Sequence, residues 1–109
     1  MKFEAQELAL TVIRTVKPVL ERVRRFDPDL ARDMKRATNS INSNLGEGNR
    51  RAKGDRIHLW EIAAGSAGEL KDQLAAARAW GYLGGPMLDE ADAVVDRMCA
   101  MLFRLIKPR

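Results

Sequence analysis

The sequence predicts an all-α fold, specifically an up-down-up-down antiparallel four-helix bundle. Glycine and proline interrupt the 109 residues at FDPDL, GEGNRRAKGD and YLGGPML, which leaves four long segments. Within each segment apolar residues recur at steps of three and four, the period of a helix that is buried on one side. No segment alternates as a strand would, and short connections favour antiparallel neighbours. We expect one domain over residues 1–109, with helices at about 3–25, 28–47, 54–81 and 86–107.

The first expected helix carries a continuous apolar stripe with one interruption. The stripe consists of Ala5, Ala9, Val12, Val16, Val19, Val23 and Phe26, widened by Leu8, Ile13 and Leu20. Pro18 removes a backbone donor inside this helix, so we expect a kink or a local break there. Asp27 followed by Pro28 is typical of a helix start, because the carboxylate caps the first turn and proline suits its first position.

The remaining three helices are predicted from the same signals, which are apolar periodicity and the positions of glycine and proline. The second should end near Gly46 or Gly48, since glycine easily adopts the left-handed conformation of a helix end. Pro86 suits the start of the fourth helix. The expected buried seams are Leu30, Met34, Ala37, Ile41 and Leu45; then Leu59, Ala63, Ser66, Leu70, Leu74 and Ala77, flanked by Ile62 and Trp80; and finally Met87, Ala91, Val94, Met98, Leu102 and Leu105.

The third expected helix has a second face of small residues, on the side away from its seam. Small side chains let another backbone approach closely, which makes this face a candidate subunit interface. Alanine is also simply a good helix former, so both interpretations stay open. The face consists of Ala64, Gly65, Gly68, Ala75, Ala76 and Ala79.

Positive charge is concentrated in the first half of the chain. The formal net charge is +4, with 19 Lys and Arg against 15 Asp and Glu, and residues 1–56 hold 13 of those cations against 8 acids. Such segregation favours a polyanionic partner, although solvated helix surfaces are also commonly basic. Aromatic residues are few, which favours recognition of the phosphate backbone of RNA or DNA over base stacking. The candidate nucleic-acid-binding residues are Arg14, Lys17, Arg24, Arg25, Arg50, Arg51, Lys53 and Arg56.

The residue types needed for catalysis or metal binding are scarce. His58 is the one histidine and Cys99 the one cysteine, so neither an internal disulfide nor a site of several His or Cys ligands can form within one subunit. Ser66 in GSAGE lies in a helical segment and lacks the strand-to-helix turn of a hydrolase nucleophile. We therefore expect no catalytic residues, no metal site and no cofactor.

The ends of the chain carry no membrane signal. Acidic residues interrupt the apolar run in MKFEAQELAL, unlike a signal peptide, and no stretch approaches the ~20 apolar residues of a membrane span. These observations predict a cytoplasmic protein without a membrane partner.

Two stretches, SINSNLGEGNRR and RIHLWEIAAGSAGELKDQLAAARAWGYL, carry a resemblance to a known family. They resemble the four-helix-bundle proteins encoded in intervening sequences of bacterial 23S ribosomal RNA genes, to which the accessory variability protein of diversity-generating retroelements is similar. Gly46 stands where that family usually has alanine, and Ala52 and Gly54 replace part of a frequent Ser-Lys-Lys run. The resemblance implies a ring-like homo-oligomer, and among ring sizes it favours a pentamer. In the retroelement branch it also implies binding to nucleic acid and to a reverse transcriptase.

The sequence thus favours a non-catalytic, homo-oligomeric protein that binds RNA or DNA, with a reverse transcriptase as an implied partner. One alternative is a protein-interaction scaffold that never contacts nucleic acid. Another is a ribonuclease, because the spacing of Arg51 and His58 resembles the Arg-x4-6-His motif of helical HEPN ribonucleases. In this chain that pair straddles a turn with two helices still to follow, unlike the usual placement in the last helices.

Overall fold

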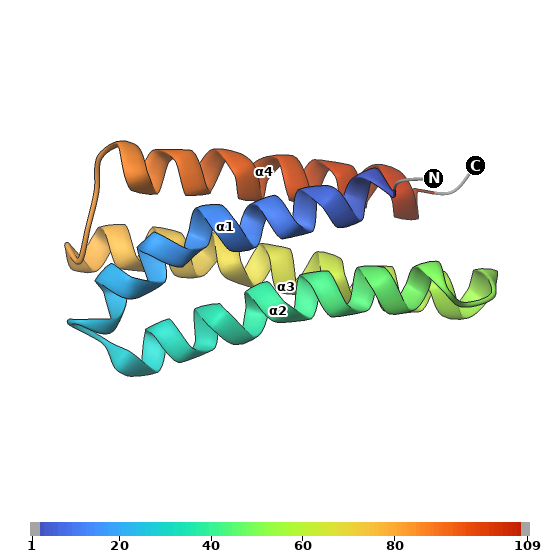
Figure 1. Cartoon of the computed structure of the whole chain (residues 1–109), viewed down its shortest axis with the longest axis horizontal. Helices are drawn as coiled ribbons and strands as arrows, with labels where there is room; N and C mark the ends of the chain where they lie inside the picture. The colour runs from blue at the N-terminus through green and yellow to red at the C-terminus, as the bar shows by residue number, and fades with distance from the viewer. Residues whose placement is uncertain (1–2, 108–109) are drawn as a thin grey trace.

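Four helices packed side by side make up the computed structural model, which describes residues 3–107 (Figure 1). They are α1 (Glu4–Arg24), α2 (Pro28–Asn49), α3 (Lys53–Trp80) and α4 (Pro86–Ile106). Each helix packs on the next in sequence, and α4 packs back on α1, within an envelope of 42 × 23 × 23 Å. Successive helices run in opposite directions (Figure 1). The described residues contain no strand, so the predicted all-α bundle is confirmed, with helix ends within two residues of expectation.

One hydrophobic core runs along the axis of the bundle and receives side chains from all four helices. The valines of the predicted α1 stripe are completely buried, and the predicted apolar positions in the middle of the other helices are buried with them. The largest fully buried side chains are Met34, Ile41, Leu45, Leu70, Leu74, Leu88, Met98 and Leu102. Helix α1 continues through Pro18 as a single element, so the proline causes no break in the helix.

The predicted seams are wrong at several helix ends. Phe26 is 57% exposed and Trp80 is 70% exposed, and Met87 is also exposed, with its neighbour Leu88 buried instead. The three rings of Phe26, Tyr82 and Trp80 stack in series on the outside of one end of the bundle, with centroids 5.5 and 6.2 Å apart. A helical period predicts which face points inward, but it does not show whether the first and last turns are covered by neighbouring helices.

The end of α2 differs from the prediction for a physical reason. The helix continues through Gly46 and Gly48 to Asn49, and neither glycine has a positive φ. Gly48 is buried against the indole of Trp60, so close that a Cβ added to it would lie 2.8 Å from the ring. Trp60 itself is buried in place of the expected Leu59, and its Nε1 donates to the Leu45 carbonyl at 3.3 Å. Gly48 therefore allows a close helix–helix approach and does not terminate the helix.

The turns at the opposite end of the bundle follow the sequence signals closely. The Asp27 carboxylate accepts a hydrogen bond from the Leu30 backbone N–H at 3.0 Å, which confirms the predicted start of α2. The Tyr82 hydroxyl donates to the same carboxylate at 3.0 Å and so ties the α1–α2 turn to the α3–α4 turn. Burial, followed by this hydrogen bond, raises the pKa of Tyr82. Gly81 ends α3 in the left-handed conformation, with φ 78°.

Candidate nucleic-acid interface

The eight predicted cations fall into two separate groups. Arg14, Lys17, Arg24 and Arg25 belong to α1 or its C-terminal end, whereas Arg50, Arg51, Lys53 and Arg56 surround the α2–α3 turn. Because α1 and α2 are antiparallel, that turn lies near the start of α1, where the Gln6 amide donates to the Asn42 carbonyl at 3.0 Å. Arg24 lies about 27 Å further along α1 than Gln6, from the helical rise per residue. The structure therefore does not bring the eight residues into one patch.

The arginines of the α2–α3 turn are already paired within the protein. Arg50 Nη2 lies 3.0 Å and Arg51 Nε lies 2.7 Å from the two oxygens of the Glu47 carboxylate. These hydrogen bonds, that from Arg51 first, lower the pKa of Glu47 below its usual range. At neutral pH the Glu47 charge partly cancels the two guanidinium charges.

Arg56 stabilises the same turn from the α3 side. Its guanidinium donates to the backbone carbonyls of Gly48 at 3.3 Å and Arg51 at 3.1 Å. The guanidinium carbon also lies 5.7 Å from the centre of the Trp60 ring, a cation–π distance. Arg56 therefore acts first as a structural residue, whereas Lys53 is exposed at the start of α3.

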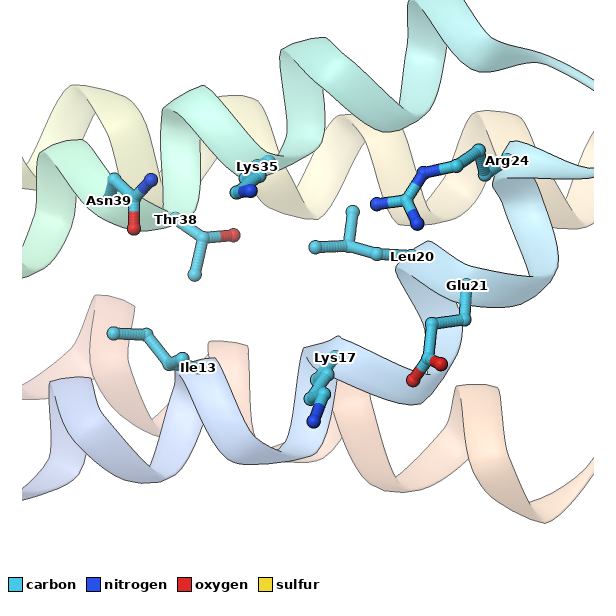
Figure 2. Close-up of a pocket in the computed structure, with 8 residues that line it drawn as sticks. All are labelled: Ile13, Lys17, Leu20, Glu21, Arg24, Lys35, Thr38 and Asn39. Carbon is cyan, nitrogen blue, oxygen red and sulfur yellow. The ribbon is translucent and has the colours of Figure 1, made fainter.

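The cations of the α1 group are exposed, and within residues 3–107 none of them forms an ion pair. Lys17 and Arg24 border a groove of about 340 Å³ between α1 and α2, which we call the α1–α2 groove (Figure 2). Arg14 and Arg25 lie on α1 and its end without lining it. The lining residues are Ile13, Lys17, Leu20, Glu21, Arg24, Lys35, Thr38 and Asn39.

Lys35 is a third cation at the α1–α2 groove, and the sequence did not predict it as a binding residue. It lies on α2 across the groove from α1, is exposed, and forms no ion pair within the described chain. Its neighbours Arg32 and Arg36 are paired with Asp29 at 2.9 Å and with Asp33 at 3.6 Å. The sequence does show that each arginine follows an acid by three residues whereas Lys35 does not, but only the packing of α2 on α1 places Lys35 beside the groove.

The α1–α2 groove has an apolar floor and a charged rim. Leu20 from α1 and Thr38 from α2 point toward the space between the helices, and the Arg24 guanidinium extends over it (Figure 2). Thr38 is only 4% exposed, and its hydroxyl donates to the Met34 carbonyl at 2.7 Å. The Lys17 ammonium and the carboxylate of Glu21, the one acid of the rim, both point away from α2 (Figure 2). The rim therefore carries three cations without ion pairs and one acid beside a largely apolar surface.

Of the three residues weighed for catalysis, Arg51 and Ser66 have partners within the protein. His58 is exposed on α3, and Arg51 faces Glu47 across the turn. Ser66 donates its hydroxyl proton to the Ser40 hydroxyl oxygen at 2.7 Å, so it links α3 to α2. Burial raises the pKa of the half-buried Cys99 thiol. Across residues 3–107, no three His, Cys, Asp or Glu side chains gather closely enough to hold a metal ion.

The opposite side of the bundle, formed by α3 and α4, is less basic and more apolar. Lys71 on α3 pairs with Asp92 and Asp96 on α4, and the Asp96 contact in particular raises the pKa of Lys71. A second groove of about 330 Å³, the α3–α4 groove, is lined by Ala64, Cys99, Phe103, Ile106 and Lys107. Phe103 is 69% exposed there. No helix in the described part of the chain is long and apolar enough to cross a membrane.

A comparison with protein families identifies the family of the chain. The sequence model for the 23S rRNA-intervening sequence protein family matches residues 2–104. The chain belongs to this family. The crystal structure of a protein with unknown function from the S23 ribosomal protein family of Bacteroides thetaiotaomicron superposes with a TM-score of 0.85. The two chains are 18% identical over 95% of this chain and 99% of the other, a likeness that shows the shared fold. No curated protein matches the chain.

Proposed function

We propose that this intervening-sequence protein is a non-catalytic, homo-oligomeric protein that binds RNA or DNA through the α1–α2 face. The observation that carries the proposal is the set of three unpaired cations, Lys17, Arg24 and Lys35, around one groove. An ion pair already satisfied within a protein has little charge to offer, whereas an unpaired cation can replace a counterion on a phosphate. The α1–α2 groove is therefore the primary contact, and the paired arginines of the α2–α3 turn are secondary.

The distribution of charge along the chain also supports the α1–α2 side of the bundle as the nucleic-acid-binding face. Residues 1–56, which form α1, α2 and the following turn, hold 13 Lys and Arg against 8 Asp and Glu. Residues 57–109 hold 6 against 7. The surface potential should therefore be positive over α1 and α2 and near neutral over α3 and α4, which orients a polyanion toward the α1–α2 groove.

Self-association is the second part of the proposal. The α3–α4 groove exposes Phe103 beside Ala64 and Ile106, an apolar surface on the side of the bundle opposite α1 and α2. A ring needs two different surfaces that meet in successive subunits, and this groove is one candidate. Burial of the α3–α4 groove in a pentameric ring leaves the α1–α2 grooves open, so the weak phosphate contacts of each subunit add along one polyanion. A reverse transcriptase is the partner that the resemblance to the retroelement accessory protein suggests.

Replacing Phe103 by glutamate is expected to reduce the oligomer to smaller species. A charge on this exposed apolar side chain must be desolvated when two subunits meet, while the monomer keeps it in water. Light scattering coupled to size-exclusion chromatography measures the mass directly. Met87→Glu, which also places an acid at an exposed apolar position of α4, is the matched control and should leave the mass unchanged. An unaltered mass for Phe103→Glu would exclude this groove as the subunit contact.

Binding itself is tested by fluorescence anisotropy of labelled structured RNA and duplex DNA at several salt concentrations. The proposal predicts a linear fall of log affinity with log salt, whose slope counts the phosphate contacts. Absence of binding at 50 mM salt would reject nucleic acid as the partner. The scaffold interpretation would then remain, with the α3–α4 groove as the surface to examine.

Replacing Glu47 by glutamine is expected to strengthen nucleic-acid binding. The change removes the negative charge that Arg50 and Arg51 now face at 3.0 and 2.7 Å, so both guanidiniums become more attractive to phosphate. Affinity should rise severalfold at low salt, with a steeper salt dependence. Acidification should have the same effect once the pH falls through the lowered pKa of Glu47. Equal affinities for the variant and the wild type would show that the α2–α3 turn does not contact the polyanion.

A further inference from the structure

The α1–α2 groove has features that binding to phosphates alone does not require. A cation that contacts a phosphate needs only solvent exposure, yet here the three cations surround an apolar floor formed by Ile13 and Leu20. We propose that the groove receives one unstacked nucleotide of a single strand, with its base on the floor and its phosphates on the rim. This inference rests on the proposed function and specifies its substrate class: single-stranded segments or loops in preference to continuous duplex.

The floor and Arg24 together form a slot for a planar group. The aliphatic side chain of Leu20 lies on one side of the space and the Arg24 guanidinium extends over it (Figure 2). Guanidinium planes stack on unpaired bases in RNA recognition, and the aliphatic floor is desolvated when a flat ring covers it. The groove volume of about 340 Å³ lies at the lower end of the range for small-molecule sites, which suits one nucleotide.

Polar groups at the ends of the slot match the remaining parts of a nucleotide. Asn39 lines the same groove, is exposed, and its amide forms no hydrogen bond within residues 3–107. An amide offers both a donor and an acceptor to the edge of a base. Lys17 and Lys35 border the groove from α1 and α2, so each can reach a phosphate on its own side.

The aromatic residues do not supply an alternative platform. Phe3 stacks on Trp60 at 5.7 Å, and Phe26, Tyr82 and Trp80 stack on one another at the end of the bundle. None of these five rings lines the α1–α2 groove. The scarcity of aromatic residues predicts recognition without base contacts. The structure instead offers the Arg24 guanidinium and the aliphatic carbons of Ile13 and Leu20 as surfaces on which a base can stack.

An acidic amphipathic helix fits the groove less well than a nucleotide. Such a helix buries a row of apolar anchors, which requires a continuous apolar channel. Here two of the eight lining side chains are aliphatic, and Thr38 and Asn39 interrupt the floor. A short planar group with an anionic tail uses both the aliphatic and the polar lining residues.

The experiment compares three labelled 12-nucleotide probes: a single strand, the same strand with abasic sites throughout, and its duplex. Affinities are measured by anisotropy for the full chain and for Ile13→Gln, which makes the floor polar without changing the charge or adding an aromatic ring. We expect the abasic strand to bind the wild type about tenfold more weakly than the native strand. Ile13→Gln should reduce this difference while keeping the salt slope. Met101→Gln is the matched control, because Met101 lines a different groove of about 340 Å³ between α1 and α4 that is also lined by Glu4 and Glu7.

A second variant leaves the apolar floor of the groove unchanged. Asn39→Ala changes an exposed side chain and should reduce binding of the native strand while leaving the abasic strand unaffected. Equal affinity of the wild type for native and abasic strands would overturn the inference and leave phosphate binding intact. If the wild type bound a labelled Glu-rich amphipathic peptide but not the oligonucleotide, and Ile13→Gln lost that binding, the inference would also be overturned and the groove would be assigned to a protein. Absence of all polyanion binding at low salt would reject the proposed function as well.

Discussion

Gly48→Ala is expected to destabilise the protein, although alanine is the better helix former. The added Cβ would lie 2.8 Å from the Trp60 ring and 3.2 Å from the Arg56 backbone carbonyl, and neither can move freely. Trp60 is held by its hydrogen bond to the Leu45 carbonyl. Overpacking of this kind costs about 1–3 kcal/mol, which exceeds the gain in helix propensity. Urea unfolding followed by circular dichroism measures the loss.

Gly65→Ala is the matched control for this change. Gly65 also lies inside a helix, but nothing approaches within 4 Å of a Cβ at that position. Only the gain in propensity remains there, so Gly65→Ala should stabilise the fold by up to about 1 kcal/mol. If Gly48→Ala were as stable as Gly65→Ala, the close packing of α2 on the Trp60 ring would be wrong.

The second large effect is expected from reversing the charge at the α1–α2 groove. Lys17→Glu combined with Arg24→Glu replaces two unpaired cations with two acids, beside the acid already present at Glu21. Two lost phosphate contacts should reduce the salt slope by about two, and nucleic-acid affinity at moderate salt should fall about 100-fold. Both side chains are exposed, so the free energy of unfolding should change little.

The double variant Arg97→Glu and Arg104→Glu is the control that distinguishes the effect of the α1–α2 groove from the effect of net charge on binding. Both arginines are exposed on α4, and their reversal changes the net charge by the same amount. We expect this pair to retain most of the wild-type affinity and salt slope. Equal weakening by the two double variants would mean that long-range attraction governs binding and that the α1–α2 groove has no special role.

The fold could be predicted from the sequence because its signals are local. The helical period indicates which face is buried, Asp27 and Pro28 start α2, and Gly81 ends α3. Gly48 misled the prediction because glycine is equally suited to end a helix and to admit a neighbouring side chain. Only the position of Trp60 distinguishes the two roles, and Trp60 belongs to another helix.

The candidate site could be predicted only in part. Lys17 and Arg24 were found, since both belong to the basic stripe of α1. Lys35 could not be found, because its role depends on how α2 packs on α1. Glu47 precedes Arg50 and Arg51 by three and four residues, a helical spacing that could have indicated the shared carboxylate. The spacing of acids along a helix therefore indicates which arginines are paired, whereas tertiary structure determines which unpaired cations share a groove.

Methyl NMR of isoleucine-labelled protein during titration with single-stranded RNA tests the account most directly. The five isoleucines are spread over the bundle: Ile13 lines the α1–α2 groove, Ile41 is in the core, Ile57 follows the α2–α3 turn, and Ile62 and Ile106 lie on α3 and α4. We predict the largest shift change at Ile13, with little change at Ile62 and Ile106. A shift at Ile57 or Ile62 with Ile13 unchanged would contradict the assignment of the α1–α2 face as the nucleic-acid interface.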